Sequence, residues 1–218
     1  MKSRMKIDFV SDVSCPWCAI GLKSLEQALA RVDDRIEAEL HFQPFELNPQ
    51  MPPEGQDIVE HIRQKYGSSA SDVERNRAAI RQRGAEVGFT FNMEQRGRIY
   101  NTFDAHRLLH WAALEGRQQV LKEALLRAYF GEGRNPADHQ VLVEIAQASG
   151  LDPLRAKAIL ESDEYAAETR AQEQFYLDHG IHSVPAIVIN QRHLISGGQP
   201  VEVFERALLQ IAAESSAA

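Results

Sequence analysis

Hydrophobic and polar residues recur along the first part of the chain with two different periods. Residues 7–10 form a short β-rich run, which is typical of a buried strand. Residues 17–32 repeat apolar side chains at steps of three and four, as the buried face of a helix does. Residues 36–42 alternate apolar and polar side chains, as a half-buried strand does. The pattern therefore predicts a β-α-β unit.

The middle of the chain, residues 56–171, has a helical pattern almost throughout. Glycine and proline residues divide it, since glycine ends helices and proline is tolerated in their first turn. The predicted helical segments are residues 56–66, 70–86, 99–115, 118–130, 138–148 and 153–161. The β signal returns at residues 186–189 and 193–195, which predict a hairpin, and Pro200 opens a last helix.

The predicted order of elements is β-α-β, a long run of helices, and then α-β-β-α. The first and last parts of the chain must pair to complete one sheet. We therefore expect an α/β protein in which residues 1–46 and 172–218 form one discontinuous domain. Residues 47–171 are then a helical insertion into that domain.

Composition and charge exclude several classes of protein. Of the 218 residues, 44% are hydrophobic and 25% are charged, which is ordinary for a globular protein. The net charge of −7 argues against a nucleic-acid partner, which would need clustered positive charge. Asp8 and Asp12 interrupt the first apolar stretch, so we expect no signal peptide. No apolar run is long enough to span a membrane, and we expect a cytoplasmic protein with no membrane partner.

The chain contains two cysteines, Cys15 and Cys18, in the sequence Cys-Pro-Trp-Cys. Two cysteines placed at random in a chain of this length would have this spacing roughly one time in a hundred. They follow a predicted strand and precede a predicted helix, which is typical of a thiol–disulfide redox site. In a reducing compartment a permanent structural disulfide is not expected, which favours a catalytic pair.

A helix that begins at Pro16 gives the two thiols different roles. Cys15 becomes the N-cap residue, and we expect its sulfur to face the unpaired N–H groups of the first turn, which favour a thiolate. Cys18 lies one turn later on the apolar face, where burial favours its protonated form. Cys15 is therefore predicted to be an exposed nucleophile, and Cys18 the thiol that resolves the mixed disulfide.

Two other interpretations of the cysteine pair stay open. Cys-x-x-Cys is also half of a zinc site, which two histidines would have to complete. The thiols could also be a buried structural pair, although Pro16 would then be coincidental. We expect no metal, because the sequence has no second cysteine pair.

The sequence Ser183-Val184-Pro185 comes directly before the strand predicted at residues 186–189. Proline lacks an N–H group for a central ladder and so fits the first residue of a strand. A cis bond before Pro185 would turn the backbone groups of Val184 outward, toward an extended substrate. The residues expected to bind substrate are Pro16, Trp17, Val184 and Pro185.

Several polar residues are candidates for supporting roles. Asp12, three residues before the cysteine pair, is a candidate proton relay for Cys18 or simply a turn residue, and Glu46 is a weaker candidate relay. His106 and His110 have the i,i+4 spacing of a helical metal site. The sequence offers no evident third ligand, which favours a packing role for both histidines.

Motifs throughout the chain resemble the DsbA-like branch of the thioredoxin superfamily, and specifically its FrnE-like oxidoreductases. The matching motifs are residues 12–18 (DVSCPWC), 45–49 (FELNP), 101–107 (NTFDAHR), 184–185 (VP) and 196–200 (SGGQP). The resemblance implies a thioredoxin fold with a helical insertion, a redox pair at Cys15 and Cys18, and a cis-proline at Pro185 facing that pair. It also implies that Asn101, His106 and Arg107 lie near the active cleft.

Hydroxychromene-carboxylate isomerases and kappa-class glutathione transferases are related branches that bind glutathione. They normally have serine at the position of Cys15 and tend to have an acidic residue at that of Gln199. We therefore expect a thiol–disulfide oxidoreductase acting on protein or small thiols, with a glutathione-dependent isomerase or transferase as the alternative. No cofactor is expected to be tightly bound, glutathione is a candidate redox partner or ligand, and the protein is expected to be a monomer or homodimer.

Overall fold

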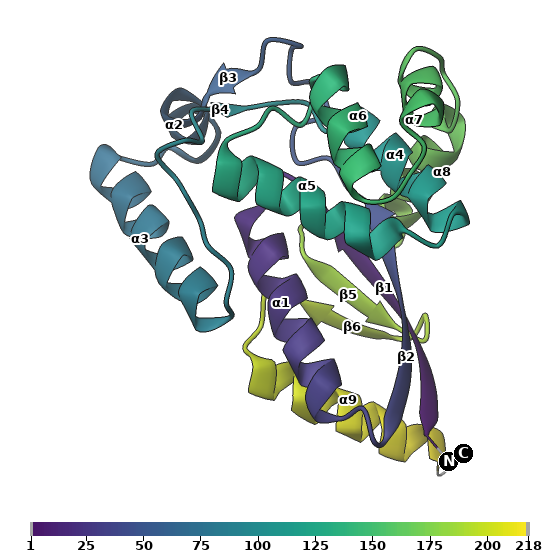
Figure 1. The fold of residues 1–218 in the computed structure, drawn as a ribbon. Coiled ribbons are helices and arrows are strands. Elements are labelled where there is room, and N and C mark those ends of the chain that lie inside the picture. Colours follow the sequence, from purple (N-terminus) through teal and green to yellow (C-terminus); the bar gives the residue numbers. More distant parts are fainter. Residues whose placement is uncertain (1, 217–218) are drawn as a thin grey trace.

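The computed structural model describes residues 2–216 and contains a mixed sheet of four strands. The strand order is β2-β1-β5-β6 (Figure 1). The central strand β1 (Ser3–Ser11) is parallel to β2 (Ile36–Pro44) and antiparallel to β5 (Ala186–Ile189). Strand β5 also pairs antiparallel with β6 (His193–Ser196), which forms one edge of the sheet.

The pairing of β1 with β5 joins the two ends of the sequence, as predicted. Ile7 lies opposite Ile189 and Phe9 opposite Ile187, and all four side chains are fully buried. A central strand that is covered on both faces has a continuous rather than an alternating apolar pattern. That explains why β1 gave only a short, irregular signal in the sequence.

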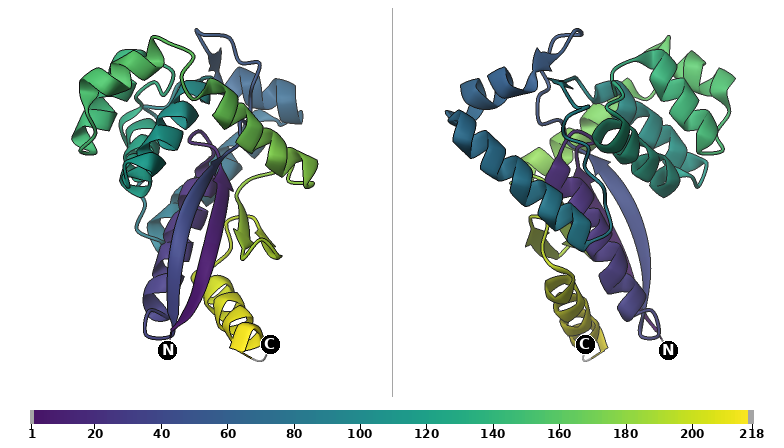
Figure 2. Two further views of the ribbon diagram at one scale, coloured as in Figure 1. Left: turned by 90° about the vertical axis from the view of Figure 1, so that its right-hand side faces the viewer. Right: turned by 60° about the vertical axis from the view of Figure 1, so that its left-hand side comes forward.

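Helices cover both faces of the sheet. Helix α1 (Pro16–Arg31) and helix α9 (Val201–Ser216) lie side by side on one face, where Phe9 packs in the main core (Figures 1 and 2). Helix α8 (Ala166–Asp178) covers part of the other face, where Val10 packs with Tyr176. The described ends of the chain both lie at the base of the sheet, away from the remaining helices (Figure 1).

The remaining helices lie between β2 and β5 in the sequence, in the stretch predicted as an insertion. They are α2 (Ile58–Tyr66), α3 (Ala70–Glu86), α4 (Phe103–Leu114), α5 (Gln118–Glu132), α6 (His139–Ala148) and α7 (Pro153–Leu160). Helices α2 and α3 project from one side of the molecule, whereas α4 to α7 form a second group above the sheet (Figure 2). The division at residue 171 stays a prediction; helix α8 runs across it.

The insertion also contains a short two-stranded sheet that the helical pattern missed. Strand β3 (Gln56–Asp57) pairs antiparallel with β4 (Arg98–Ile99), and all of β3 and Ile99 of β4 fall in segments predicted as helix. Helix α2 starts only after Asp57, whose side chain accepts hydrogen bonds from the N–H groups of Val59 and Glu60. An N-cap of this kind fixes where a helix begins, and such a boundary is hard to predict from periodicity alone. Along residues 2–216, no helix is both long and apolar enough to cross a membrane.

Two glycines let the end of the hairpin approach the first turns of α1. Gly198 follows β6, and a Cβ atom there would lie 2.8 Å from the carbonyl oxygen of Trp17. A Cβ on Gly21 would lie 3.1 Å from both Gly198 Cα and the ring of Pro185. Side chains at these positions would push the loop away from the helix that carries the cysteine pair.

We expect Gly198→Ala to lower the free energy of unfolding by about 1–3 kcal/mol, because overpacking against backbone atoms costs about that much. Gly97→Ala is the matched control, since a Cβ on Gly97 meets nothing within 4 Å. Urea unfolding of both variants measures the two effects. Equal losses of unfolding free energy in the two variants would contradict the crowding at Gly198.

Candidate active site

Cys15 lies where β1 passes into α1. Its backbone is extended, with φ −93° and ψ 114°, and it is the N-cap residue with Pro16 in the first helical position. Its carbonyl oxygen accepts hydrogen bonds from the N–H groups of Cys18 (3.1 Å) and Ala19 (3.4 Å). This is the helix start that the sequence predicted, and it places the cysteine pair on the first turn.

The position of Cys15 differs from the prediction in two respects. The residue is only 4% exposed, so the prediction of an exposed nucleophile is wrong. Cys15 lies instead in the wall of a cavity that the insertion helps to enclose. The Cys15 side chain makes no capping hydrogen bond to the first turn of α1. Its Sγ atom instead lies 3.8 Å from the carbonyl oxygen of Val184, which the β1–β5 pairing brings close.

Cys18 is fully buried beneath Cys15, and both residues are free thiols. Burial raises the pKa of the Cys18 thiol well above its usual range, and the adjacent sulfur of Cys15 adds to the rise. The positive charge of Lys122 acts in the opposite direction. Cys18 is therefore protonated at neutral pH, as the sequence predicted from its place on the apolar face.

Lys122, on α5, was not predicted as a site residue. Its side chain is 1% exposed, and its Nζ atom has no hydrogen-bond partner among the described residues. Burial lowers its pKa, and the nearby Cys18 and Asp12 oppose that change. A signal for it existed in the sequence: Lys122 shares the apolar stripe of its helix with Leu125 and Tyr129, at steps of three and four.

Asp12 is a buried carboxylate in the turn between β1 and the cysteine pair. Its oxygens accept hydrogen bonds from the N–H groups of Ser14 (3.1 Å) and Leu47 (2.7 Å). Its Oδ1 atom lies 3.6 Å from Nε2 of His106, which is equally buried on α4. Burial disfavours the ionised form of Asp12, but the His106 ring and the two backbone donors outweigh it, so the pKa is lowered.

A cavity of about 650 Å³ opens beside Cys15. Three of the residues predicted to bind substrate line it: Pro16, Trp17 and Val184. Pro185 is buried instead and packs against α1 at Gly21, and the Val184–Pro185 bond is cis. The apolar residues that line the cavity from the insertion include Leu47, Ile58, Ile62, Val73, Ile80, Met93 and Ile99.

The cavity is positively charged although the protein is acidic. Lys65, Arg77 and Arg96 line it, whereas Glu46 is the one acidic residue among its described lining residues. The Glu46 carboxylate is bound by Arg170 and accepts a hydrogen bond from Asn101 Nδ2 at 3.2 Å. Glu46 is thus neutralised by its own partner, and the cations of the cavity keep their charge.

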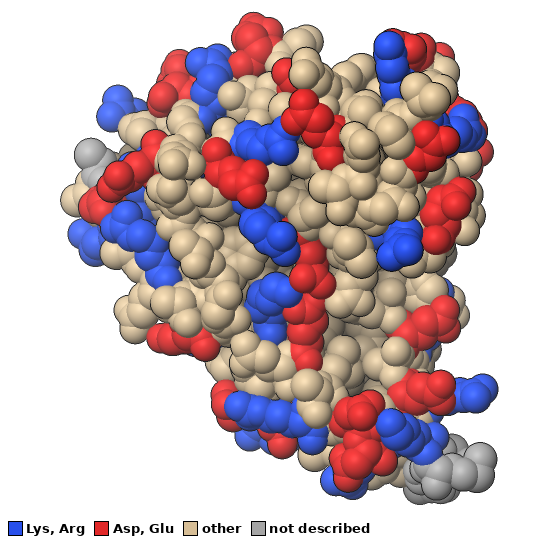
Figure 3. All heavy atoms as spheres, in the orientation of Figure 1, with Lys and Arg blue, Asp and Glu red and all other residues tan. Residues whose placement is uncertain are grey.

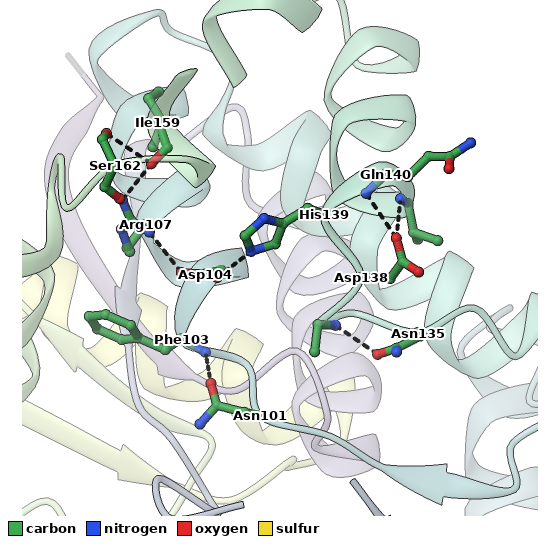
Figure 4. A network of polar contacts seen from close by, with 12 residues as sticks. Asn101, Phe103, Asp104, Arg107, Asn135, Asp138, His139, Gln140, Ile159 and Ser162 are labelled. Carbon is green, nitrogen blue, oxygen red and sulfur yellow. Dashed lines mark hydrogen bonds and ion pairs between the residues drawn. The ribbon is translucent and has the colours of Figure 1, made fainter. Parts of the chain in front are cut away.

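Asn101, His106 and Arg107 do not line this cavity themselves. Asn101 and His106 lie behind its wall, where they contact Glu46 and Asp12. Arg107 is a buried structural residue: its guanidinium donates to the carbonyl oxygens of Ile159, Ser162 and Glu164 and pairs with Asp104 (Figure 4). These bonds tie α4 to the end of α7. They give Arg107 a structural role, in holding these helices together, rather than a role in the reaction.

Asn101 and His110 also have structural partners. The Oδ1 atom of Asn101 accepts the N–H group of Phe103 at 2.9 Å, at the start of α4 (Figure 4). His110 approaches Gln172 at 3.3 Å and stacks on Tyr165. Within residues 2–216, no group of three or more His, Cys, Asp or Glu side chains is arranged to hold a metal ion.

This geometry has counterparts among known proteins. A family model described as a DSBA-like thioredoxin domain matches residues 6–209. The crystal structure of a probable DsbA oxidoreductase from Streptomyces coelicolor is 34% identical, with a TM-score of 0.89, and the match covers 94% of this chain and 89% of that chain. The uncharacterized protein YwbO of Bacillus subtilis is 25% identical over 203 residues, which are 93% of this chain and 94% of that protein. The cytosolic disulfide reductase DsbM from Pseudomonas aeruginosa with GSH is similar in fold, with a TM-score of 0.63 and 18% identity over 94% of this chain and 98% of that chain.

We expect Lys122→Met to raise the free energy of unfolding by about 1–3 kcal/mol at neutral pH, since a buried polar group without a partner costs about that much. A lowered pKa means that the folded state binds fewer protons than the unfolded state at intermediate pH. The cost of Lys122 is therefore largest at low pH and fades as the pH approaches the ordinary lysine pKa of about 10.4. Urea unfolding of both proteins between about pH 6 and about pH 10 should show a shrinking difference.

Lys157→Met serves as the control for this experiment, because Lys157 is 62% exposed and makes only a surface pair with Glu161. Its effect should stay within about 0.5 kcal/mol at every pH. A loss of stability in Lys122→Met, or a gain that does not change with pH, would contradict the buried-cation interpretation.

Proposed function

The chain belongs to the family of DSBA-like thioredoxin domains, and on this premise we propose that it is a thiol–disulfide oxidoreductase of the FrnE-like branch. Cys15 is the nucleophile and Cys18 the resolving thiol. One observation carries the proposal: Cys15 caps α1 at the wall of a cavity, while Cys18 lies fully buried one turn behind it, and both are free.

The first step is attack on a substrate disulfide. The Cys15 thiol loses its proton, and the thiolate attacks one sulfur of R–S–S–R to form a Cys15–S–S–R bond. The substrate S–S bond breaks, and one RS⁻ leaves with the electron pair. That thiolate takes up a proton and departs as RSH.

The second step completes a two-electron transfer. Cys18 loses its proton and attacks the sulfur of Cys15, which forms the Cys15–Cys18 disulfide and releases the second RS⁻. The substrate has gained two electrons and two protons, and the protein dithiol has lost them. A thiol reductant restores the dithiol, and the reverse sequence oxidises a substrate dithiol.

The polar and apolar neighbours of the pair have distinct roles in this proposal. Pro16, Trp17 and Val184 contact the substrate from the cavity wall, while Pro185 holds Val184 in place against α1. Asp12 is the proposed proton relay for Cys18. Its lowered pKa keeps the carboxylate ionised at neutral pH, so it is a weak base that holds the proton only in passing.

Electrons are carried by the two cysteines, so the reaction needs no tightly bound cofactor. Glutathione is a candidate reductant or ligand, and the fold shared with DsbM, which is described as cytosolic and with GSH, supports both this partner and a cytoplasmic location. The proposed substrates are protein or small thiols and disulfides. Whether the chain acts as a monomer or homodimer stays a prediction.

We expect Cys15→Ser to reduce disulfide reduction to the uncatalysed rate, because serine cannot form the mixed disulfide. Cys18→Ser should form the mixed disulfide and then accumulate it. Insulin and glutathione disulfide, with dithiothreitol as reductant, test the first variant, and mass spectrometry of the intact protein detects the adduct in the second. Circular dichroism of all proteins controls for folding.

Two outcomes contradict this mechanism. Full reductase activity in Cys15→Ser would remove Cys15 as the nucleophile. Glutathione-dependent turnover of a small molecule that is unchanged in Cys18→Ala, with no redox cycling in the parent protein, would indicate a reaction that uses a single thiol.

A further inference from the structure

We propose that the cavity beside Cys15 selects small thiols and disulfides that carry a carboxylate, and that Arg96 binds that carboxylate. This inference rests on the proposed function, since it names the substrate class for the same cysteine pair. It is carried by a buried cation in the cavity wall that has no carboxylate partner.

Arg96 is 8% exposed, and its Nε atom has no hydrogen-bond partner in the described part of the chain. Its guanidinium lies 5.0 Å from the ring centroids of both Tyr129 and Phe130, which fix its position. Its polar contacts are with neutral groups only: Nη1 lies 3.9 Å from the sulfur of Met93, and the side chain hydrogen-bonds the Tyr129 hydroxyl. A guanidinium has five N–H donors, and these few contacts leave most of them, including that on Nε, available to an anion.

Other cations of the cavity also lack acidic partners. Lys65 donates only to neutral oxygens, the carbonyl of Leu47 (2.7 Å) and the side chain of Asn48 (2.8 Å). Arg77, on α3, makes no ion pair with any residue between 2 and 216. On the face shown in Figure 3, by contrast, lysine and arginine side chains lie among aspartate and glutamate side chains. Lys65, Arg77 and Arg96 thus give the cavity an excess of positive charge.

The dimensions of the cavity favour a small substrate. A volume of about 650 Å³ is in the range of small-molecule sites. Cys15 is only 4% exposed, so a disulfide must enter the cavity to reach its sulfur. A disulfide on the surface of a folded protein is poorly suited to such entry. The isoleucine side chains of the wall, such as Ile62 and Ile80, accommodate an apolar carbon chain between the disulfide and its acidic end.

The test compares two disulfides of similar length, the dianionic dithiodipropionate and the neutral hydroxyethyl disulfide. The rate constant for oxidation of the reduced protein is measured for each by quenching with iodoacetamide and mass spectrometry. The parent protein should prefer dithiodipropionate. In Arg96→Met, the ratio of the two rate constants should fall about tenfold or more, because a buried charge-assisted hydrogen bond is lost.

Arg81→Met is the matched control, since Arg81 lies on α3, pairs with Glu74 and is not among the cavity-lining residues. It removes the same formal charge and should leave the ratio unchanged. Arg96→Lys should keep most of the preference. If Arg96→Met does not fold, Arg96→Gln replaces it, because it also removes the charge and should lose the preference. Thermal unfolding of each variant provides the folding check.

A binding measurement separates this proposal from the reaction mechanism. In Cys15→Ser, which lacks the attacking thiol, calorimetry measures the Kd of dithiodipropionate without turnover. Adding Arg96→Met should weaken that Kd about tenfold or more, and adding Arg81→Met should not. Equal losses on both disulfides, no preference in the parent protein, or a Kd independent of Arg96 would each overturn the anion site. A Cys15→Ser protein that still reduces disulfides would overturn the mechanism alone.

Discussion

The antiparallel pairing of β1 with β5 is the constraint on which the site depends. Val10 lies opposite Ala186, so the C-terminal end of β1 lies beside the N-terminal end of β5. The loop after β1 and the loop before β5 must therefore meet, although 169 residues separate Cys15 from Val184. The loop after β1 carries the Cys15 thiol, and the loop before β5 carries the cis-proline. Local structure alone could not bring these two parts of the site together.

Buried charge is the second organising feature. Asp12, His106 and Lys122 come from a turn, from α4 and from α5, and all three are at least 97% buried. Burial of such groups is unfavourable unless they are paired, and Lys122 is unpaired. Helices of the insertion thus place ionisable groups behind the cysteines that the sheet domain supplies. Apolar side chains would pack there at lower cost, so a contribution to stability does not explain these groups.

Local patterns in the sequence predicted much of the fold and the chemistry, and long-range packing set the rest. The helix start at Pro16, the burial of Cys18 and the strand after Pro185 follow from proline chemistry and periodicity, and the structure contains all three. The burial of Cys15 could not be predicted, because residues distant in sequence close over it. Arg107 shows the converse: a motif residue expected at the cleft binds backbone carbonyls instead, and its partners are recognisable only in three dimensions.

The walls of the cavity come from different parts of the chain. The cysteine turn and residues 182–184 supply one wall, while α2, α3 and the segment around Arg96 supply the other. Substitutions in the second wall leave the thiol pair and the β1–β5 junction untouched. In the proposed mechanism, exchanges in this region would therefore change substrate preference and leave electron transfer by the cysteine pair intact. One wall of the cavity in this mechanism thus carries the reacting thiols, and the other wall recognises the substrate.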